Sequence, residues 1–299
     1  MIGRFAPSPT GRMHLGNVWC ALASYLSVKS QGGRWVLRIE DLDPERSRQA
    51  YADQLMRDLE WLGLQWDEGP YYQHNRSDYY ASLLEQLSDD IFPCYCSRSD
   101  LLSASAPHAS DGRAVYSGRC RSLTLEQRQL AAMHKQPSLR MRVPDAAISF
   151  QDRVYGPRTY SLARDTGDFI VRRSDGVFAY HLAVVADDHA QGVTEIVRGC
   201  DLLPATAPQL LLYDRLGFPR PVYAHIPLLV ASDGSRLCKR DKALDLGALQ
   251  ASGVSPERLF GSLGAASGLL TQAEDTPLSE LLERFDWRKI PTDPIKIPL

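Results

Sequence analysis

The fold is decided first by residues 4–17, which read RFAPSPTGRMHLGN. Pro7, Pro9 and Gly11 exclude a regular helix, because proline lacks the backbone N–H and glycine gains too much freedom outside a helix. The apolar start of the segment is typical of a short β-strand. We therefore expect a strand that runs into an ordered Pro/Gly loop.

A His-x-Gly element, His14 to Gly16, follows this loop. Apolar residues recur at helical spacing from Val18, which predicts an amphipathic helix with Asn17 as its N-cap. Gly16 leaves the first N–H groups of that helix open to an anion such as phosphate. The pattern indicates a nucleotide-binding loop, although a single His-x-Gly is also typical of an ordinary strand-loop-helix connection.

Residues 34–39 predict a buried strand that ends at the acidic sequence EDLD, residues 40–43, before a helix over residues 45–62. Strand, carboxylates and helix together indicate an α/β fold. Ligands of open parallel sheets lie beyond the carboxyl ends of the strands, so the acidic cluster belongs in or beside a site. The same carboxylates would also stabilise the N-terminus of the following helix.

The α/β pattern is interrupted over residues 88–162, which predicts an insertion. It returns with expected strands at 178–185 and 194–197 and an expected helix at 208–216 that Gly217 ends. The last part of the chain predicts a small helical bundle, with helices at 244–249, 256–263 and 278–285.

The composition is that of a globular protein: 299 residues, 44% hydrophobic and 23% charged. The longest apolar runs, 179–186 and 227–231, are too short to span a membrane, and no secretory signal precedes the first strand. We therefore expect a cytoplasmic protein with no membrane contact. The six cysteines are expected to be reduced thiols, some of them at a metal site.

The net charge of −2 argues against a dedicated nucleic-acid binder, because such domains are usually basic. A local basic tract nevertheless occurs, and it is equally compatible with an RNA-binding groove and with a solvated surface. The tract consists of Arg119, Arg121, Arg128, Lys135, Arg140 and Arg142.

Several separated blocks resemble the class I aminoacyl-tRNA synthetases in their glutamyl form. Residues 4–17 resemble the HIGH signature, RIEDLD at 38–43 resembles the R-I-E-D-x-D strand end, and RLCKR at 236–240 is similar to the K-M-S-K-S loop. Between them, residues 175–183 and 193–201 resemble the glutamate-pocket and H-x-x-R-G-x-D regions. The resemblance covers residues 3 to about 241 and implies a Rossmann-like catalytic domain.

Within that family the chain resembles the short form, the glutamyl-queuosine tRNA(Asp) synthetases, because only 299 − 239 = 60 residues follow Lys239. The resemblance implies two halves of a Rossmann-like catalytic domain, at residues 1–87 and 163–241. An inserted subdomain with a zinc site is expected between them, at residues 88–162. Residues 242–299 are expected to form a helical appendix, with no anticodon-binding domain.

Activating a carboxylic acid with ATP requires donors and cations that stabilise charge on phosphate, and no protein nucleophile. The resemblance implies His14 and Lys239 as catalytic residues, and Gly16, Asn17 and Arg236 as further contacts to ATP, which binds with Mg²⁺. The chain departs from the motifs in having Asn17 for the second His, Arg236 for the first Lys and Cys238 for the Ser.

A glutamate pocket needs a cation for the side-chain carboxylate and a carboxylate for the α-ammonium. The resemblance implies that these groups come from the first loop, the end of the acidic strand and the two later blocks. The implied residues are Arg4, Phe5, Ala6, Pro7, Ser8, Glu40, Tyr180 and Arg198.

Cys94, Cys96 and Cys120 offer three thiolates, whereas a structural zinc site needs four ligands. The residues alone nominate His108 as the fourth ligand, while the resemblance nominates Tyr116, four residues before Cys120. The site would hold one structural zinc ion per chain. Buried, unliganded thiols are the alternative, and Cys20 and Cys200 are interpreted as packing residues.

The resemblance implies an enzyme, expected as a monomer, that makes glutamyl-adenylate and transfers glutamate to queuosine at the wobble position of tRNA(Asp). A trimmed glutamyl-tRNA synthetase that charges the tRNA 3′ end is the main alternative. A nucleotidyltransferase acting on a small metabolite and an inactive RNA-binding module are further alternatives.

Overall fold

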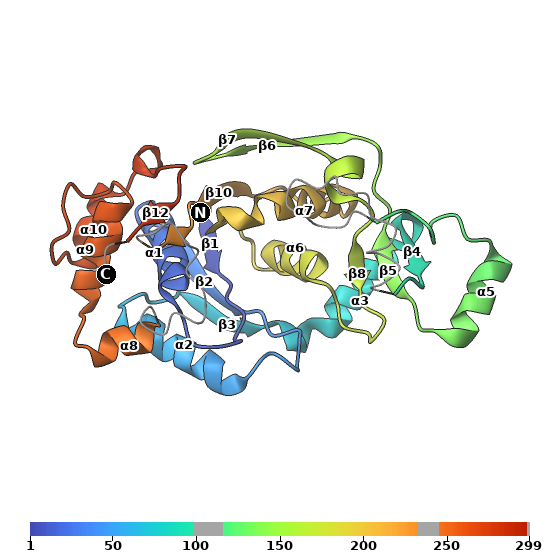
Figure 1. Cartoon of the computed structure of the whole chain (residues 1–299), viewed down its shortest axis with the longest axis horizontal. Helices are drawn as coiled ribbons and strands as arrows, with labels where there is room; N and C mark the ends of the chain where they lie inside the picture. The colour runs from blue at the N-terminus through green and yellow to red at the C-terminus, as the bar shows by residue number, and fades with distance from the viewer. Residues whose placement is uncertain (98–115, 232–244, 298–299) are drawn as a thin grey trace.

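A computed structural model describes residues 1–97, 116–231 and 245–297 of the chain (Figure 1). Its centre is a seven-stranded sheet in the order β3-β2-β1-β9-β10-β6-β7, in which only β7 is antiparallel to its neighbour. The inner strands β2, β1, β9 and β10 bury all but one residue each, as expected of a sheet with helices on its faces. The expected α/β, Rossmann-like fold is confirmed. The strands are β1 (Ile2–Phe5), β2 (Arg34–Ile39), β3 (Glu68–Tyr72), β6 (Ala147–Asp152), β7 (Gly156–Ser161), β9 (Glu195–Gly199) and β10 (Val222–Ile226).

Helices connect these parallel strands. α1 (Leu15–Lys29) links β1 to β2, α2 (Gln49–Trp61) links β2 to β3, and α7 (Leu203–Arg215) links β9 to β10. α2 begins four residues later than expected, and its apolar residues Leu55 and Leu59 are buried. α3 (Ser77–Gln86) follows β3 after a short 3-10 turn, Gln73–Arg76.

The first helix begins earlier than predicted, at Leu15, and its N-cap is His14 rather than Asn17. The N–H of Gly16 donates to His14 Nδ1 over 3.1 Å, and the N–H of His14 donates to Asn17 Oδ1 over 3.2 Å. The expected N-cap was wrong because imidazole performs the capping, while Asn17 closes the reciprocal bond from the first turn.

The strand expected at residues 178–185 is wrong, because this segment begins the helix α6 (Tyr180–Ala190). Every residue from Leu182 to Asp188 is buried. A helix that is buried on all sides has no polar face, so its apolar run cannot be told from a buried strand by periodicity.

A small antiparallel sheet of β4 (Ile91–Cys94), β5 (Ser138–Met141) and β8 (Ile170–Arg172) lies at one end of the molecule beside α5 (Leu125–His134) (Figure 1). The expected division of the chain at 87/88, 162/163 and 241/242 remains a prediction. The two sheets do not follow the boundary expected at 162/163. β6 and β7 lie before it in the chain but belong to the main sheet, whereas β8 lies after it but belongs to the small sheet.

The three helices expected in the last part of the chain are present. They lie at the end of the molecule that is far from α5 (Figure 1). They are α8 (Leu246–Ala251), α9 (Pro256–Ala266) and α10 (Leu278–Arg284), and residue 244 lies outside the described residues. Leu259, Leu263 and Leu281 share one apolar core with Val18 and Leu22 of α1. A short parallel pair, β11 (Leu229–Val230) and β12 (Ile295–Lys296), adds a second attachment. Within the described ranges, no helix is long and apolar enough to cross a membrane.

Candidate active site

A cavity of about 430 Å³ opens at the carboxyl ends of β1, β2 and β9. The strand order reverses between β1 and β9, which is the position at which α/β sheets bind ligands. The structure brings every residue expected to bind glutamate to this cavity: Arg4, Phe5, Ala6, Pro7, Ser8, Glu40, Tyr180 and Arg198.

Three of the residues expected to bind ATP, His14, Gly16 and Asn17, line the same cavity. Because His14 Nδ1 accepts the N–H of Gly16, the neutral imidazole carries its proton on Nε2. Arg236, Cys238 and Lys239 lie outside the described residues.

Arg198 is held by three buried hydrogen bonds to residues that do not line the cavity. Its Nε donates to His225 Nε2 over 3.0 Å, its Nη1 to Gln209 Oε1 over 2.7 Å and its Nη2 to Thr206 Oγ1 over 2.8 Å. A guanidinium has five N–H donors, so among the described partners one donor on each terminal nitrogen is left for a ligand. Two donors on neighbouring nitrogens match the two oxygens of a carboxylate.

His225 is itself fixed by Asp152, whose Oδ2 lies 2.6 Å from His225 Nδ1. Since Nε2 accepts from Arg198, the imidazole donates its Nδ1 proton to Asp152. Burial lowers the pKa of His225 to about 4, with the Arg198 cation contributing in the same direction. The imidazole is therefore neutral at physiological pH, and Arg198 keeps its positive charge beside the cavity.

A second buried network connects two further charged residues of the cavity, Arg4 and Glu40. Asp188 Oδ1 accepts from Arg4 Nε over 3.1 Å and from Arg38 Nη1 over 2.8 Å. Arg38 Nη2 lies 3.4 Å from Glu40 Oε1. Burial raises the pKa of Glu40 above its ordinary value although the two arginines oppose the shift. Burial alone would also raise the pKa of Asp188, but Arg38 and Arg4 outweigh it and hold that pKa low.

Cys20 lines the cavity as well, which its interpretation as a packing residue did not anticipate. Burial raises the pKa of its thiol to about 11. A thiol with this pKa stays protonated at physiological pH, so Cys20 is no nucleophile there.

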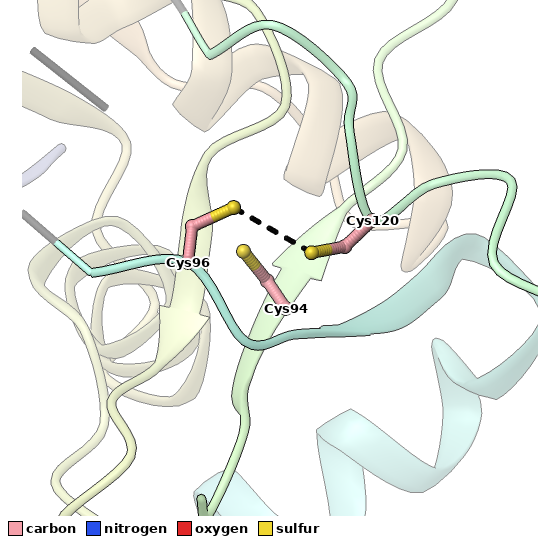
Figure 2. Close-up of side chains that lie close together, drawn as sticks. All are labelled: Cys94, Cys96 and Cys120. Carbon is pink, nitrogen blue, oxygen red and sulfur yellow. Dashed lines mark hydrogen bonds between the residues drawn. The ribbon is translucent and has the colours of Figure 1, made fainter. Parts of the chain in front are cut away.

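The cysteines of the expected metal site converge between β4 and the segment before α5 (Figure 2). The sulfur atoms of Cys94, Cys96 and Cys120 all lie within 4.8 Å of one another, and those of Cys96 and Cys120 are 3.5 Å apart. Four ligands around zinc at about 2.3 Å place sulfurs about 3.8 Å apart. The three thiols therefore fit a zinc ion, and the cluster can hold one metal ion.

Tyr116 lies beside this cluster, with its Oη 3.6 Å from Cys94 Sγ, and it accepts the N–H of Cys120 over 2.7 Å. Burial raises the pKa of Cys94, but the N–H of Cys96 and the Tyr116 and Arg140 side chains outweigh it and hold the pKa below its usual range. Burial and the neighbouring thiols raise the pKa of Cys96 to about 12. His108, the alternative fourth ligand, lies outside the described residues.

The sequence reasoning missed the residues behind the cavity, namely Asp188, Thr206, Gln209, His225 and Asp152. One signal was available for Asp188, because two adjacent acids at 187 and 188 interrupt an apolar run. Two carboxylates in a buried segment require cationic partners. The partners of His225 come from separate strands and helices, and local sequence carries no trace of them.

The chain matches known proteins along nearly its whole length. A family model described as the catalytic domain of class I tRNA synthetases (E and Q) matches residues 1–276. The Glutamyl-Q tRNA(Asp) synthetase of Symbiobacterium thermophilum is 47% identical, and the match covers 100% of this chain and 96% of that protein. The protein of the same name in Nitratidesulfovibrio vulgaris is 42% identical, with 99% and 95% covered.

A solved structure also matches. A glutamate tRNA ligase from Elizabethkingia meningosepticum, in complex with its amino acid, superposes with a TM-score of 0.86 at 28% identity over 100% of this chain and 67% of that one. Its fold agrees with the family that the model describes. The chain is therefore a member of the class I tRNA synthetases for glutamate and glutamine.

Proposed function

We propose that this enzyme activates L-glutamate with ATP and transfers the glutamyl group to queuosine at the wobble position of tRNA(Asp). The observation that carries the proposal is the convergence of the expected glutamate and ATP residues on one cavity at the strand ends. Relatives that share 47% and 42% of their residues with this chain over nearly full length are named for this activity.

In the first step, an α-carboxylate oxygen of glutamate attacks the α-phosphorus of ATP and pyrophosphate leaves. The Arg198 fork binds one carboxylate of glutamate, Arg4 adds a second cation, and Glu40 accepts the α-ammonium. His14 donates from Nε2 to a phosphate oxygen at the N-terminus of α1. The Mg²⁺ that accompanies ATP neutralises phosphate charge. Lys239, assigned by motif resemblance alone, stabilises the charge that develops on the phosphates.

In the second step, a hydroxyl of the cyclopentenediol of queuosine attacks the glutamyl carbonyl, AMP leaves and the hydroxyl proton is released. The new bond is an ester, as it would be for a ribose hydroxyl. The same positioning of acyl group and hydroxyl can therefore serve both acceptors.

The acceptor nucleoside needs a surface beside the glutamate cavity, and we assign it to a second cavity of about 330 Å³. Consecutive residues of the same two loops line the two cavities, with Ser8 and Glu40 in the first and Pro9 and Asp41 in the second. His74, which pairs with Asp41, lines the second cavity. His74→Ala is therefore expected to slow transfer to tRNA while pyrophosphate exchange is unchanged.

We propose that Cys94, Cys96, Cys120 and Tyr116 hold one structural zinc ion per chain, which would fix the segment before α5 against β4. The protein is proposed to act as a monomer in the cytoplasm, where its tRNA substrate is made. The exposed members of the basic tract near α5, Arg119, Arg121 and Lys135, remain a proposed RNA contact, with a solvated surface as the alternative. Arg140 is buried and takes no part in such a surface.

ATP–pyrophosphate exchange with and without glutamate tests the first step. Exchange that depends on glutamate and proceeds without tRNA is the expected result. Exchange that is independent of glutamate would favour a nucleotidyltransferase, and absence of exchange would favour an inactive RNA-binding module. Glutamate esterified to the terminal adenosine of tRNA would favour the trimmed glutamyl-tRNA synthetase.

A further inference from the structure

Arg4 and Glu40 both line the glutamate cavity, but no ion pair described in the structure joins them directly. They are linked through two fully buried residues behind the cavity wall, Asp188 and Arg38, each with 0% of its surface exposed. The charges alternate along this chain of contacts from Arg4 through Asp188 and Arg38 to Glu40. The described contacts thus connect one cation of the cavity, Arg4, to one of its anions, Glu40, through Asp188 and Arg38.

The geometry around Asp188 is that of a bridge. A single oxygen, Oδ1, accepts from both arginines, at 3.1 Å from Arg4 Nε and 2.8 Å from Arg38 Nη1. Arg4 lies on β1 and Arg38 on the neighbouring strand β2, so their cations would repel without the intervening carboxylate. Arg38 Nη1 also donates to Gln191 Oε1 over 2.8 Å, which fixes its orientation.

The helix that carries Asp188 also carries a residue of the cavity. Tyr180 is the first residue of α6 and lines the cavity, with 38% of its surface exposed. Asp188 lies two turns further along the same helix. Docking α6 through Asp188 therefore sets the position of Tyr180 relative to Arg4 as well.

We propose that Asp188 is a positioning residue that fixes Arg4 directly, and Glu40 through Arg38, at the spacing that bound glutamate requires. This inference rests on the proposed glutamate-activating function. Without the carboxylate, Arg38 keeps only Glu40 as an ion-pair partner and draws it away from the α-ammonium. Arg4 is then left with one described hydrogen bond, from Nη1 to Val197 O over 3.3 Å.

The neighbouring acid provides a matched control. Asp187 is equally buried, and it accepts from Arg76, from Tyr80 Oη over 2.7 Å and from Gln73 Nε2 over 2.9 Å. None of these partners lines the glutamate cavity. Asp187→Asn therefore disturbs the same helix by a similar change without touching Arg4 or Arg38.

The test measures pyrophosphate exchange as a function of glutamate and of ATP in the two variants. Asp188→Asn is expected to raise the KM for glutamate about 10- to 100-fold. Its KM for ATP should stay within about twofold of the unaltered enzyme. Asp187→Asn is expected to leave the KM for glutamate and the KM for ATP within about twofold of the unaltered enzyme. This holds even if it lowers the melting temperature as much as Asp188→Asn does.

A second readout isolates the effect on Glu40. Glutarate is glutamate without the α-amino group, so the preference for glutamate over glutarate as a competing ligand reports the ammonium contact. This preference should fall about tenfold or more in Asp188→Asn and remain in Asp187→Asn. Should Asp188→Asn not fold, Arg38→Lys is expected to show the same loss, because one ammonium cannot replace the guanidinium fork.

Unchanged glutamate constants in Asp188→Asn, or equal changes in the two aspartate variants, would overturn the positioning role. If Asp188→Asn does not fold, an unchanged preference for glutamate over glutarate in Arg38→Lys would also overturn the positioning role. Failure of the proposed function itself is recognised separately, because the unaltered chain would then show no glutamate-dependent exchange.

Discussion

The Nε of Arg198 donates to the Nε2 of His225 across 3.0 Å, in a region where both side chains are almost fully buried. The contact settles which nitrogen of His225 carries the proton, because Nε2 accepts the bond from Arg198. Because the imidazole is neutral, it adds no second positive charge beside Arg198. The consequences of this one contact for binding and for stability can be measured separately.

Arg198→Lys is expected to raise the KM for glutamate about 10- to 100-fold, because an ammonium cannot reproduce a two-pronged contact to a carboxylate. The variant also loses hydrogen bonds that the guanidinium donates to Gln209, Thr206 and His225. Pyrophosphate exchange over a range of glutamate concentrations checks this, with the KM for ATP as control. An unchanged KM for glutamate would remove Arg198 from the pocket.

Stability should fall on acidification because of His225. Its pKa is about 4 in the folded protein and 6.5 in the unfolded chain, so the unfolded chain takes up the proton first as the pH falls. The contribution is fully present above pH 6.5 and is lost progressively down to about pH 4. Between about pH 7.5 and about pH 5 this one group should cost about 2 kcal/mol of unfolding free energy.

Urea unfolding of the enzyme and of His225→Gln at both pH values checks this expectation. Glutamine can accept from Arg198 and donate to Asp152 but does not titrate, so the variant should lose about 2 kcal/mol less over the same interval. Equal pH dependence in the two proteins would show that His225 does not titrate in this way.

The zinc proposal predicts about one zinc ion per chain by elemental analysis, lost on replacement of Cys94 or Cys120 together with a drop in melting temperature. Tyr116→Phe should weaken zinc retention against a chelator, because it removes the Oη that lies 3.6 Å from Cys94 Sγ. His108→Ala serves as the control and should retain zinc. Weaker zinc retention in His108→Ala, with unchanged retention in Tyr116→Phe, would assign the fourth ligand to His108.

Lys239→Ala is expected to lower the rate of glutamyl-adenylate formation about 10²- to 10³-fold, because a loop lysine of this motif acts on charge that grows in the transition state. Glutamate binding, measured by calorimetry, should be almost unaffected. A fall in pyrophosphate exchange of less than about threefold at saturating substrates would show that Lys239 has no such role.

Much of the cavity could be predicted from the sequence because its residues occur in short contiguous motifs: residues 4–17, the end of β2 at Glu40, and the region around Arg198. The local geometry of such motifs depends little on how the rest of the chain folds. The supporting side chains could not be predicted in this way. Asp188 meets Arg4 and His225 meets Arg198 only after distant elements have packed.

The wrong assignments have equally local causes. α6 is buried on all sides from Leu182 to Asp188, so its sequence lacks the polar face whose period separates a helix from a strand. Imidazole is an uncommon helix cap, so Asn17 was the better candidate than His14 by type alone. The position of the hairpin β6–β7 could not be predicted from the sequence either, because only its pairing with β10 shows that it extends the main sheet.

The most direct test of the central claim compares the transfer of labelled glutamate to three RNAs. These are tRNA(Asp) with queuosine, the same tRNA with guanosine at the wobble position, and tRNA(Glu). The account predicts label on the first RNA alone, attached to the modified base and absent from the 3′ terminal adenosine. Label on tRNA(Glu) but none on queuosine-containing tRNA(Asp) would contradict it.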